Sequence, residues 1–104
     1  MSLPVVRLSR GRFDAQRYPE VRKKLDSARN SLIPAIRALR GRLHYWAAID
    51  PESNSMVNIS VWSSLEAAKQ METLAPMLAL ATEFASRGVT FERPITNYET
   101  LWEI

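Results

Sequence analysis

The segment MVNISVW, from Met56 to Trp62, constrains the fold most, because two kinds of side chain alternate along it with a period of two. Such alternation is typical of a strand in the middle of a sheet. One face is uniformly β-branched and is expected to pack against a hydrophobic layer, whereas the other carries an amide, a hydroxyl and an indole. The branched face comprises Val57, Ile59 and Val61, and the mixed face comprises Met56, Asn58, Ser60 and Trp62.

The rest of the chain fits around this strand in the order β-α-β-β-α-β. Alternating or apolar patterns predict strands over 5–13, 43–49, 56–62 and 90–93, and an extended tail over 97–104. The polar stretch 50–55 predicts a turn that joins the second and third strands into an antiparallel hairpin. Apolar residues three and four apart predict one helix from Pro19 to Gly41 and another from Ser63 or Ser64 to Gly88.

Two prolines lie inside these helical patterns, at positions 34 and 76. A proline inside a helix removes a hydrogen bond and clashes with the preceding turn. We therefore expect a kink or restart near Asn30 and Ser31 in the first helix, and a kink or break at Pro76 in the second.

This order predicts a ferredoxin-like α+β fold, with one antiparallel sheet and both helices on one face. The 104 residues suit a single domain spanning 1–104. The second sheet face would stay open, yet Met56, Trp62 and other large apolar residues cannot all lie on the helix side. We therefore expect a homodimer that packs sheet face to sheet face, with the tail after Pro94 able to cross to the partner.

Composition excludes several classes of site. The chain has no cysteine, and therefore no disulfide, thiolate metal site or cysteine nucleophile. The sequence shows no metal-ligand cluster, paired carboxylates or glycine-rich phosphate loop, so neither a metal nor a bound cofactor is expected. It also shows neither a signal peptide nor an apolar run long enough to span a membrane, which favours a cytoplasmic protein.

The net charge of +3 is unevenly distributed. Residues 1–42 carry eleven Arg and Lys against three Asp and Glu, a net of +8, whereas residues 43–104 carry three against eight, a net of −5. The two oppositely charged halves can attract each other within the fold or across a subunit contact, and the basic half can also bind an anionic partner. The simplest interpretation is a basic, exposed helix.

The run WSSLEAA, from Trp62 to Ala68, places a tryptophan at the end of a strand and a serine-bearing helix start directly after it. Together with residues 41–45 and 57–62, this layout resembles the antibiotic biosynthesis monooxygenase group of the dimeric α+β barrel superfamily. The resemblance covers nearly the whole chain and implies a homodimeric barrel. The group contains cofactor-free monooxygenases of polycyclic aromatic phenols, haem-degrading proteins and many members of unassigned function.

Asn58 and Trp62 resemble an Asn-x-x-x-Trp pair that the cofactor-free enzymes place in their substrate pocket. On one strand the two residues share a face, about 13 Å apart. An amide can hold a phenolate or carbonyl oxygen, and an indole can pack on an aromatic ring. The resemblance therefore implies that Asn58 and Trp62 are catalytic, acting on a reduced aromatic molecule that reacts with oxygen in a pocket without water.

The chain departs from the group in two places. Haem-degrading relatives carry a histidine about ten residues after the tryptophan, where this chain has Gln70-Met71-Glu72. The cofactor-free enzymes carry a tyrosine and an arginine on the second helix, where this chain has Ala68 and Thr82.

Further candidates come from neighbouring strands. His44, the single histidine, is either a catalytic acid–base or a structural residue. If the hairpin pairs residues whose numbers sum to 106, His44 and Trp46 share a face with Asn58, whereas a sum of 105 separates them. Asn58 itself is either a ligand contact or a satisfied amide at the dimer seam. The candidates for substrate binding are Trp46, Ser60, Arg93 and Tyr98.

Three functions follow from this reading. The first is a cofactor-independent oxygenase that acts on a small aromatic or apolar molecule held between sheet and helices. The second is a non-catalytic homodimer that binds a small ligand or serves a stress response. The third, RNA binding, ranks last, because the first strand has no aromatic residue for base stacking before Phe13 and the basic half lies mostly on a helix.

Overall fold

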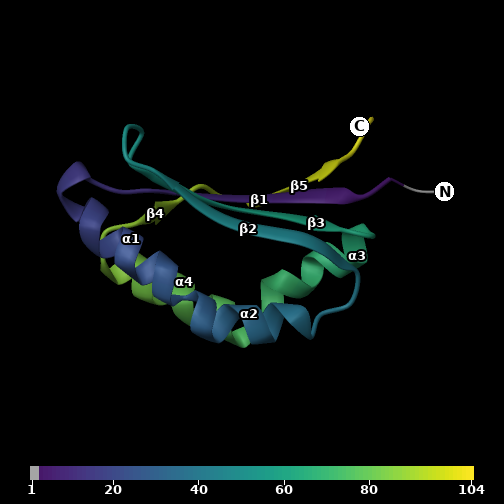
Figure 1. The fold of residues 1–104 in the computed structure, drawn as a ribbon, viewed down its shortest axis with the longest axis horizontal. Coiled ribbons are helices and arrows are strands. Elements are labelled where there is room, and N and C mark those ends of the chain that lie inside the picture. Colours follow the sequence, from purple (N-terminus) through teal and green to yellow (C-terminus); the bar gives the residue numbers. More distant parts are fainter. Residues whose placement is uncertain (1–2) are drawn as a thin grey trace.

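The computed structural model describes residues 3–104, which form two layers, a twisted sheet and a row of helices along one of its faces (Figure 1). The strands are β1 (Val5–Arg12), β2 (Arg42–Asp50), β3 (Ser55–Trp62), β4 (Thr90–Phe91) and β5 (Thr96–Glu99). The helices are α1 (Tyr18–Ser27), α2 (Arg29–Arg37), α3 (Leu65–Lys69) and α4 (Ala75–Ser86), and the short 3₁₀ turns are η1 (Ala15–Arg17) and η2 (Gln70–Thr73).

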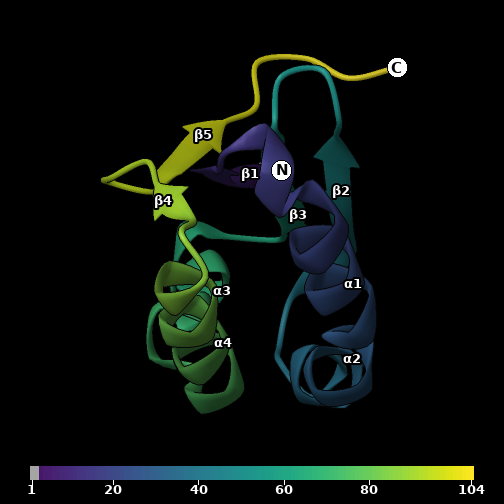
Figure 2. The ribbon, with the colours of Figure 1, turned by 90° about the vertical axis from the view of Figure 1, so that its left-hand side faces the viewer.

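The sheet is antiparallel throughout and open, in the order β2-β3-β1-β4, with β5 also pairing β1. The ferredoxin-like α+β architecture predicted from the sequence is therefore confirmed. Figure 2 shows two columns of helices beneath the sheet, α1 with α2 on the β2 side and α3 with α4 on the β4 side.

Both helical regions are interrupted, as their prolines predict. The first breaks at Ala28, between α1 and α2, slightly before the expected position near Asn30 and Ser31, and Pro34 lies within α2. In the second, α3 and η2 end before α4, and Pro76 occupies the first turn of α4, where its missing N–H costs no helical hydrogen bond. The side chain of Ser64 caps α3 by accepting a hydrogen bond from the Ala67 N–H.

The mixed face of β3 lies under the helices, which corrects the expectation that its large residues help to form an open dimer face. Met56 and Trp62 are 1% and 0% exposed. The Trp62 indole N–H donates a 2.8 Å hydrogen bond to Ser60 Oγ, so its polar atom is satisfied inside the core. The β-branched residues instead lie half-buried on the opposite sheet face. Alternation separates the two faces of a strand but does not say which one the helices cover.

The β2–β3 hairpin pairs residues whose numbers sum to 105. His44 lies opposite Val61, and Trp46 lies opposite Ile59, beyond an irregularity in the pairing between Arg42 and His44. This register places His44 and Trp46 on the open sheet face, away from Asn58.

The C-terminal segment pairs within its own chain. Residues of β5 lie beside β1, with Asn97 opposite Arg7 and Tyr98 opposite Val6, so the expectation that this part of the tail crosses to a partner is wrong. Beyond β5 the side chains of Leu101 and Trp102 are exposed.

The core lies between the sheet and the helices. At the edges of this core, basic residues of the N-terminal part of the chain form ion pairs with acidic residues of the C-terminal part. Glu92 pairs with Arg10 and Arg12, and Glu83 pairs with Lys24. These pairs are partly or largely exposed, so each contributes little to stability. Within residues 3–104, no helix is both long and apolar enough to cross a membrane.

Candidate functional site between the sheet and helix α4

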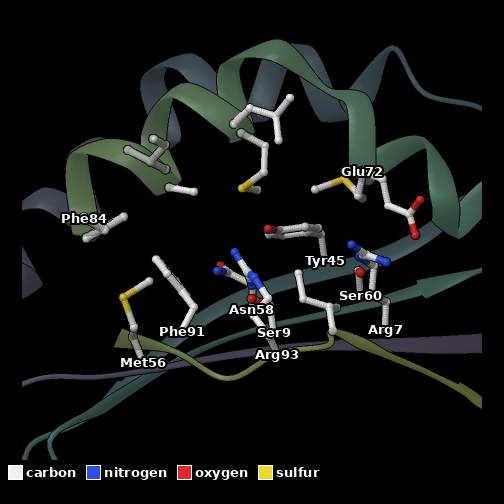
Figure 3. Close-up of a pocket in the computed structure, with 16 residues that line it drawn as sticks. Arg7, Ser9, Tyr45, Met56, Asn58, Ser60, Glu72, Phe84, Phe91 and Arg93 are labelled. Atoms are coloured by element: carbon white, nitrogen blue, oxygen red, sulfur yellow. The ribbon is translucent and has the colours of Figure 1, made fainter. Parts of the chain in front are cut away.

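A cavity of about 250 Å³ lies between the sheet and the η2–α4 segment (Figure 3). Strands β1, β2 and β3 form its floor, η2 and α4 its roof, and β4 with the following link one wall. The lining residues are Arg7, Ser9, Tyr45, Met56, Asn58, Ser60, Met71, Glu72, Met77, Leu78, Leu80, Ala81, Phe84, Phe91, Arg93 and Ile95.

Strand pairing gathers the polar side chains of the floor into two rows. Ser60 is the partner of both Tyr45 and Arg7, so these three residues form one row across the sheet. Asn58 is the partner of Ser9 in the next row. Rows two residues apart are roughly 7 Å apart along the strands. The floor therefore presents polar groups at two separate positions.

The roof is apolar. The chain breaks at Leu74, between η2 and α4, and the inward side chains of these two segments are mostly methionine, leucine and phenylalanine. Apolar walls with a few convergent polar groups are typical of small-molecule sites. Glu72, at the end of η2, is the single carboxylate among the lining residues, and its side chain is exposed.

Asn58 carries a buried polar atom without a protein partner. Two side-chain oxygens of this kind occur within residues 3–104, Asn58 Oδ1 and Thr100 Oγ1, and only Asn58 lines the cavity. Buried polar atoms are normally hydrogen-bonded, so an unpartnered one facing a cavity suggests a bound molecule that supplies the partner. Its position under the helices excludes the alternative that Asn58 is a satisfied amide at a seam between open sheet faces.

Arg7 is a buried cation, with 6% of the residue exposed. Its Nη1 donates a 3.2 Å hydrogen bond to Asn97 Oδ1. Within residues 3–104, no carboxylate oxygen lies within 4.0 Å of its guanidinium, as an ion pair would require. Burial lowers the pKa of Arg7, and the Glu72 carboxylate partly offsets that effect. A buried cation without a contacting anion favours an anionic ligand.

Tyr45 and Arg93 complete the polar lining. Burial raises the pKa of Tyr45 well above its ordinary value, the Arg7 charge opposing this, so its hydroxyl remains a neutral hydrogen-bond donor. The Arg93 guanidinium lies 5.4 Å from the centre of the Phe91 ring, within the range of a cation–π interaction. In Figure 3 the Tyr45 ring lies between Arg7 and Ser60 on one side and Asn58 and Arg93 on the other.

The structure separates the predicted site residues into two groups. Asn58, Ser60 and Arg93 line the cavity, and Trp62 lies buried against Ser60. His44, Trp46 and Tyr98 belong to the other sheet face, where the His44 and Trp46 rings stack 5.2 Å apart and Tyr98 is half-exposed. Within residues 3–104, no group of three or more histidine, cysteine, aspartate or glutamate side chains is placed to hold a metal ion.

Sequence reasoning missed Arg7, Tyr45 and Glu72. Arg7 and Ser9 alternate with Val6 and Leu8, a pattern that resembles an ordinary solvent-facing strand side. Tyr45 joins the cavity only in the register whose pairs sum to 105, which the residues alone leave open. No local signal marks Glu72.

Comparisons with known proteins identify the fold. No family model matches the sequence, and neither does any curated protein. A proposed antibiotic biosynthesis monooxygenase from Deinococcus radiodurans superposes with a TM-score of 0.74 at 20% identity, over 96% of this chain and 95% of that one. SnoaB, a cofactor-independent oxygenase from Streptomyces nogalater, superposes with a TM-score of 0.69 at 16% identity, over 97% of this chain and 96% of that one. A proposed antibiotic biosynthesis monooxygenase from Nitrosomonas europaea superposes with a TM-score of 0.72 at 10% identity, over 98% of this chain and 94% of that one. The chain therefore has the fold of antibiotic biosynthesis monooxygenase-like proteins, as the sequence resemblance implied.

Proposed function

We propose that the chain binds a small aromatic phenol in the cavity under α4 and oxidises it as a cofactor-independent monooxygenase. The observation that carries this proposal is the buried, unpartnered oxygen of Asn58 on the floor of a cavity whose roof is mostly apolar. A phenol fits both features, because its ring is apolar and its hydroxyl can pair with either end of an amide. The similarity in fold to a cofactor-independent oxygenase supports the choice of reaction.

The lining residues have distinct roles in this proposal. Asn58 holds the phenol oxygen. Arg93, which lies with Asn58 on one side of the Tyr45 ring (Figure 3), brings positive charge to this end of the cavity and stabilises the phenolate, the electron-rich form that reacts with oxygen. Trp62 does not line the cavity and acts through Ser60, whose hydroxyl it orients.

The reaction consumes one O₂ per phenol. For 1-naphthol, a C–H bond at the position para to the hydroxyl is replaced by C=O, which gives 1,4-naphthoquinone. One atom of O₂ enters the product, the other leaves as water with the two hydrogens lost from carbon and oxygen, and the phenol supplies the electrons. A two-ring substrate suits the cavity, which at a packing density of about 0.74 takes a molecule of about 185 Å³.

The test combines binding and oxygen uptake. Calorimetric titration of the protein with 1-naphthol should show saturable binding, and an oxygen electrode should record uptake with ¹⁸O from ¹⁸O₂ in the quinone. Asn58→Ala should lower the affinity for 1-naphthol and the rate of oxygen uptake by about ten-fold or more, since the buried hydroxyl of the ligand loses its hydrogen-bond partner. Thr100→Val, which removes the unpartnered hydroxyl outside the cavity, is the matched control. Uptake that is equal in the wild type and Asn58→Ala would refute the proposal, and binding without uptake would favour the non-catalytic ligand-binding alternative.

We also propose that the open sheet face is the surface of a homodimer. This face carries the half-exposed Trp46 and Tyr98 beside the β-branched side of β3. An apolar face of this kind fits a second copy of the chain. Sedimentation at micromolar concentration should show a dimer for the wild type and a monomer for Trp46→Arg. A monomeric wild type would contradict the proposal.

A further inference from the structure

One end of the cavity is built to receive an anion. Arg7 is buried there without a contacting carboxylate, and Ser60 is its neighbour in the same cross-strand row. Ser60 Oγ already accepts the indole N–H of Trp62, so the hydroxyl proton of Ser60 is free to be donated. A guanidinium and a hydroxyl donor side by side match the two oxygens of a carboxylate.

The other end requires different chemistry. Asn58 Oδ1 is an acceptor without a partner, so it pairs with a donor on the ligand, such as a neutral hydroxyl. Asn58 lies in the row next to Ser60, roughly 7 Å further along the strands. Between the two ends, the roof over the floor is apolar. A ligand that satisfies both ends therefore has an acid group and a hydroxyl group at opposite sides of an aromatic body.

We propose that the ligand of this cavity is a hydroxyaryl carboxylate, with its carboxylate at Arg7 and Ser60 and its hydroxyl at Asn58. This inference rests on the proposed function and narrows it, because it makes the acid group a requirement for tight binding. The phenolic ring then lies over the Asn58 end, where the oxidation takes place.

Glu72 opposes this anion. Its carboxylate is close enough to influence Arg7 but makes no ion pair with it, and its side chain is exposed. With Arg7 and Arg93 the lining carries two positive charges against this single negative one, a net of +1. Removing the charge of Glu72 should therefore strengthen binding of an anion at Arg7.

The experiment compares three related molecules by calorimetric titration of the unmodified protein. The probe 5-hydroxy-2-naphthoate carries both groups, 1-naphthol lacks the carboxylate, and 2-naphthoate lacks the hydroxyl. We expect the dissociation constant of 5-hydroxy-2-naphthoate to be lower than that of 1-naphthol or 2-naphthoate by about ten-fold or more, because each of these two molecules lacks one buried polar contact. These comparisons need no mutation and are unaffected by the folding of a variant.

Variants then assign each contact to its residue. Arg7→Met should abolish the preference for 5-hydroxy-2-naphthoate over 1-naphthol, and Asn58→Leu should abolish its preference over 2-naphthoate. Glu72→Gln should tighten binding of both carboxylates by about three-fold at low salt, and this gain should shrink as salt is added. The control Glu66→Gln changes an exposed carboxylate of α3 outside this cavity and should alter neither affinity.

The outcomes separate this inference from the proposed function. If 1-naphthol binds as tightly as 5-hydroxy-2-naphthoate, or if Arg7→Met leaves the preference unchanged, the acid-binding end is refuted and the phenol pocket stands. If none of the three molecules shows saturable binding, both proposals fail.

Discussion

Replacing Asn58 with leucine is expected to stabilise the ligand-free protein while it weakens phenol binding. A buried acceptor without a partner costs about 1–3 kcal/mol of stability. The polar cavity has room for water, which can satisfy part of the amide in the free protein, so we take the lower end of that range, about 1 kcal/mol. For a chain of 104 residues, this gain corresponds to a rise in Tm of about 4–8 °C.

The assay is thermal unfolding of wild type and Asn58→Leu by circular dichroism, with and without 1-naphthol. Protein concentration is held constant, because association would itself raise Tm. Thr100→Val is the control, since it removes the other unpartnered buried oxygen of the described residues. It should produce a similar rise in Tm but leave the stabilisation by 1-naphthol unchanged.

The result that would refute this reasoning is a fall in Tm of Asn58→Leu by several degrees. Such a fall would mean that the Asn58 amide makes a hydrogen bond in the folded, ligand-free protein. A rise in Tm with unchanged binding of 1-naphthol would confirm that the amide has no partner in the free protein. It would contradict the proposal that the amide binds the phenol. A rise in Tm together with weaker binding is the pattern expected of a residue kept for function at the expense of stability.

Three further predictions concern local features of the fold. Gly41→Ala should destabilise the protein by about 1–2 kcal/mol or more in chemical unfolding, because φ is +74° and an added Cβ would lie 2.8 Å from Ala67 Cβ; no loss would contradict this strained turn. Ser64→Ala should cost about 1 kcal/mol in the same assay through loss of the α3 cap, whereas Ser64→Asp should retain most of the stability. Tyr45 has a raised pKa in the folded protein, so its contribution to stability is complete below its ordinary value of 10.0 and is lost as the pH rises above it. Tyr45→Phe should therefore show a smaller fall in Tm between pH 9 and 11 than the wild type, and equal falls would contradict the burial of the hydroxyl.

The amino-acid sequence by itself determined the order of helices and strands, and it pointed to Asn58 as a candidate ligand contact. Period-two alternation and helical spacing are local properties, so they identified the strands and helices, and Pro76 pointed to a real break, which lies just before it at Leu74. The resemblance carried by the Trp62 region led to a fold that solved structures confirm, and it drew attention to Asn58.

Only the tertiary structure decided how these pieces combine. The side of β3 that faces the helices depends on the packing of whole layers, because both faces of an alternating strand repeat with the same period. Register is set where the hairpin closes, with Asp50 opposite Ser55, and a shift to pairs that sum to 106 would put Trp46 in place of Tyr45 opposite Ser60. Arg7 reaches Ser60 through the pairing of strands some fifty residues apart in sequence, so no local pattern records that contact. The candidate site is a product of these long-range pairings, whereas the fold rests mainly on local periodicity.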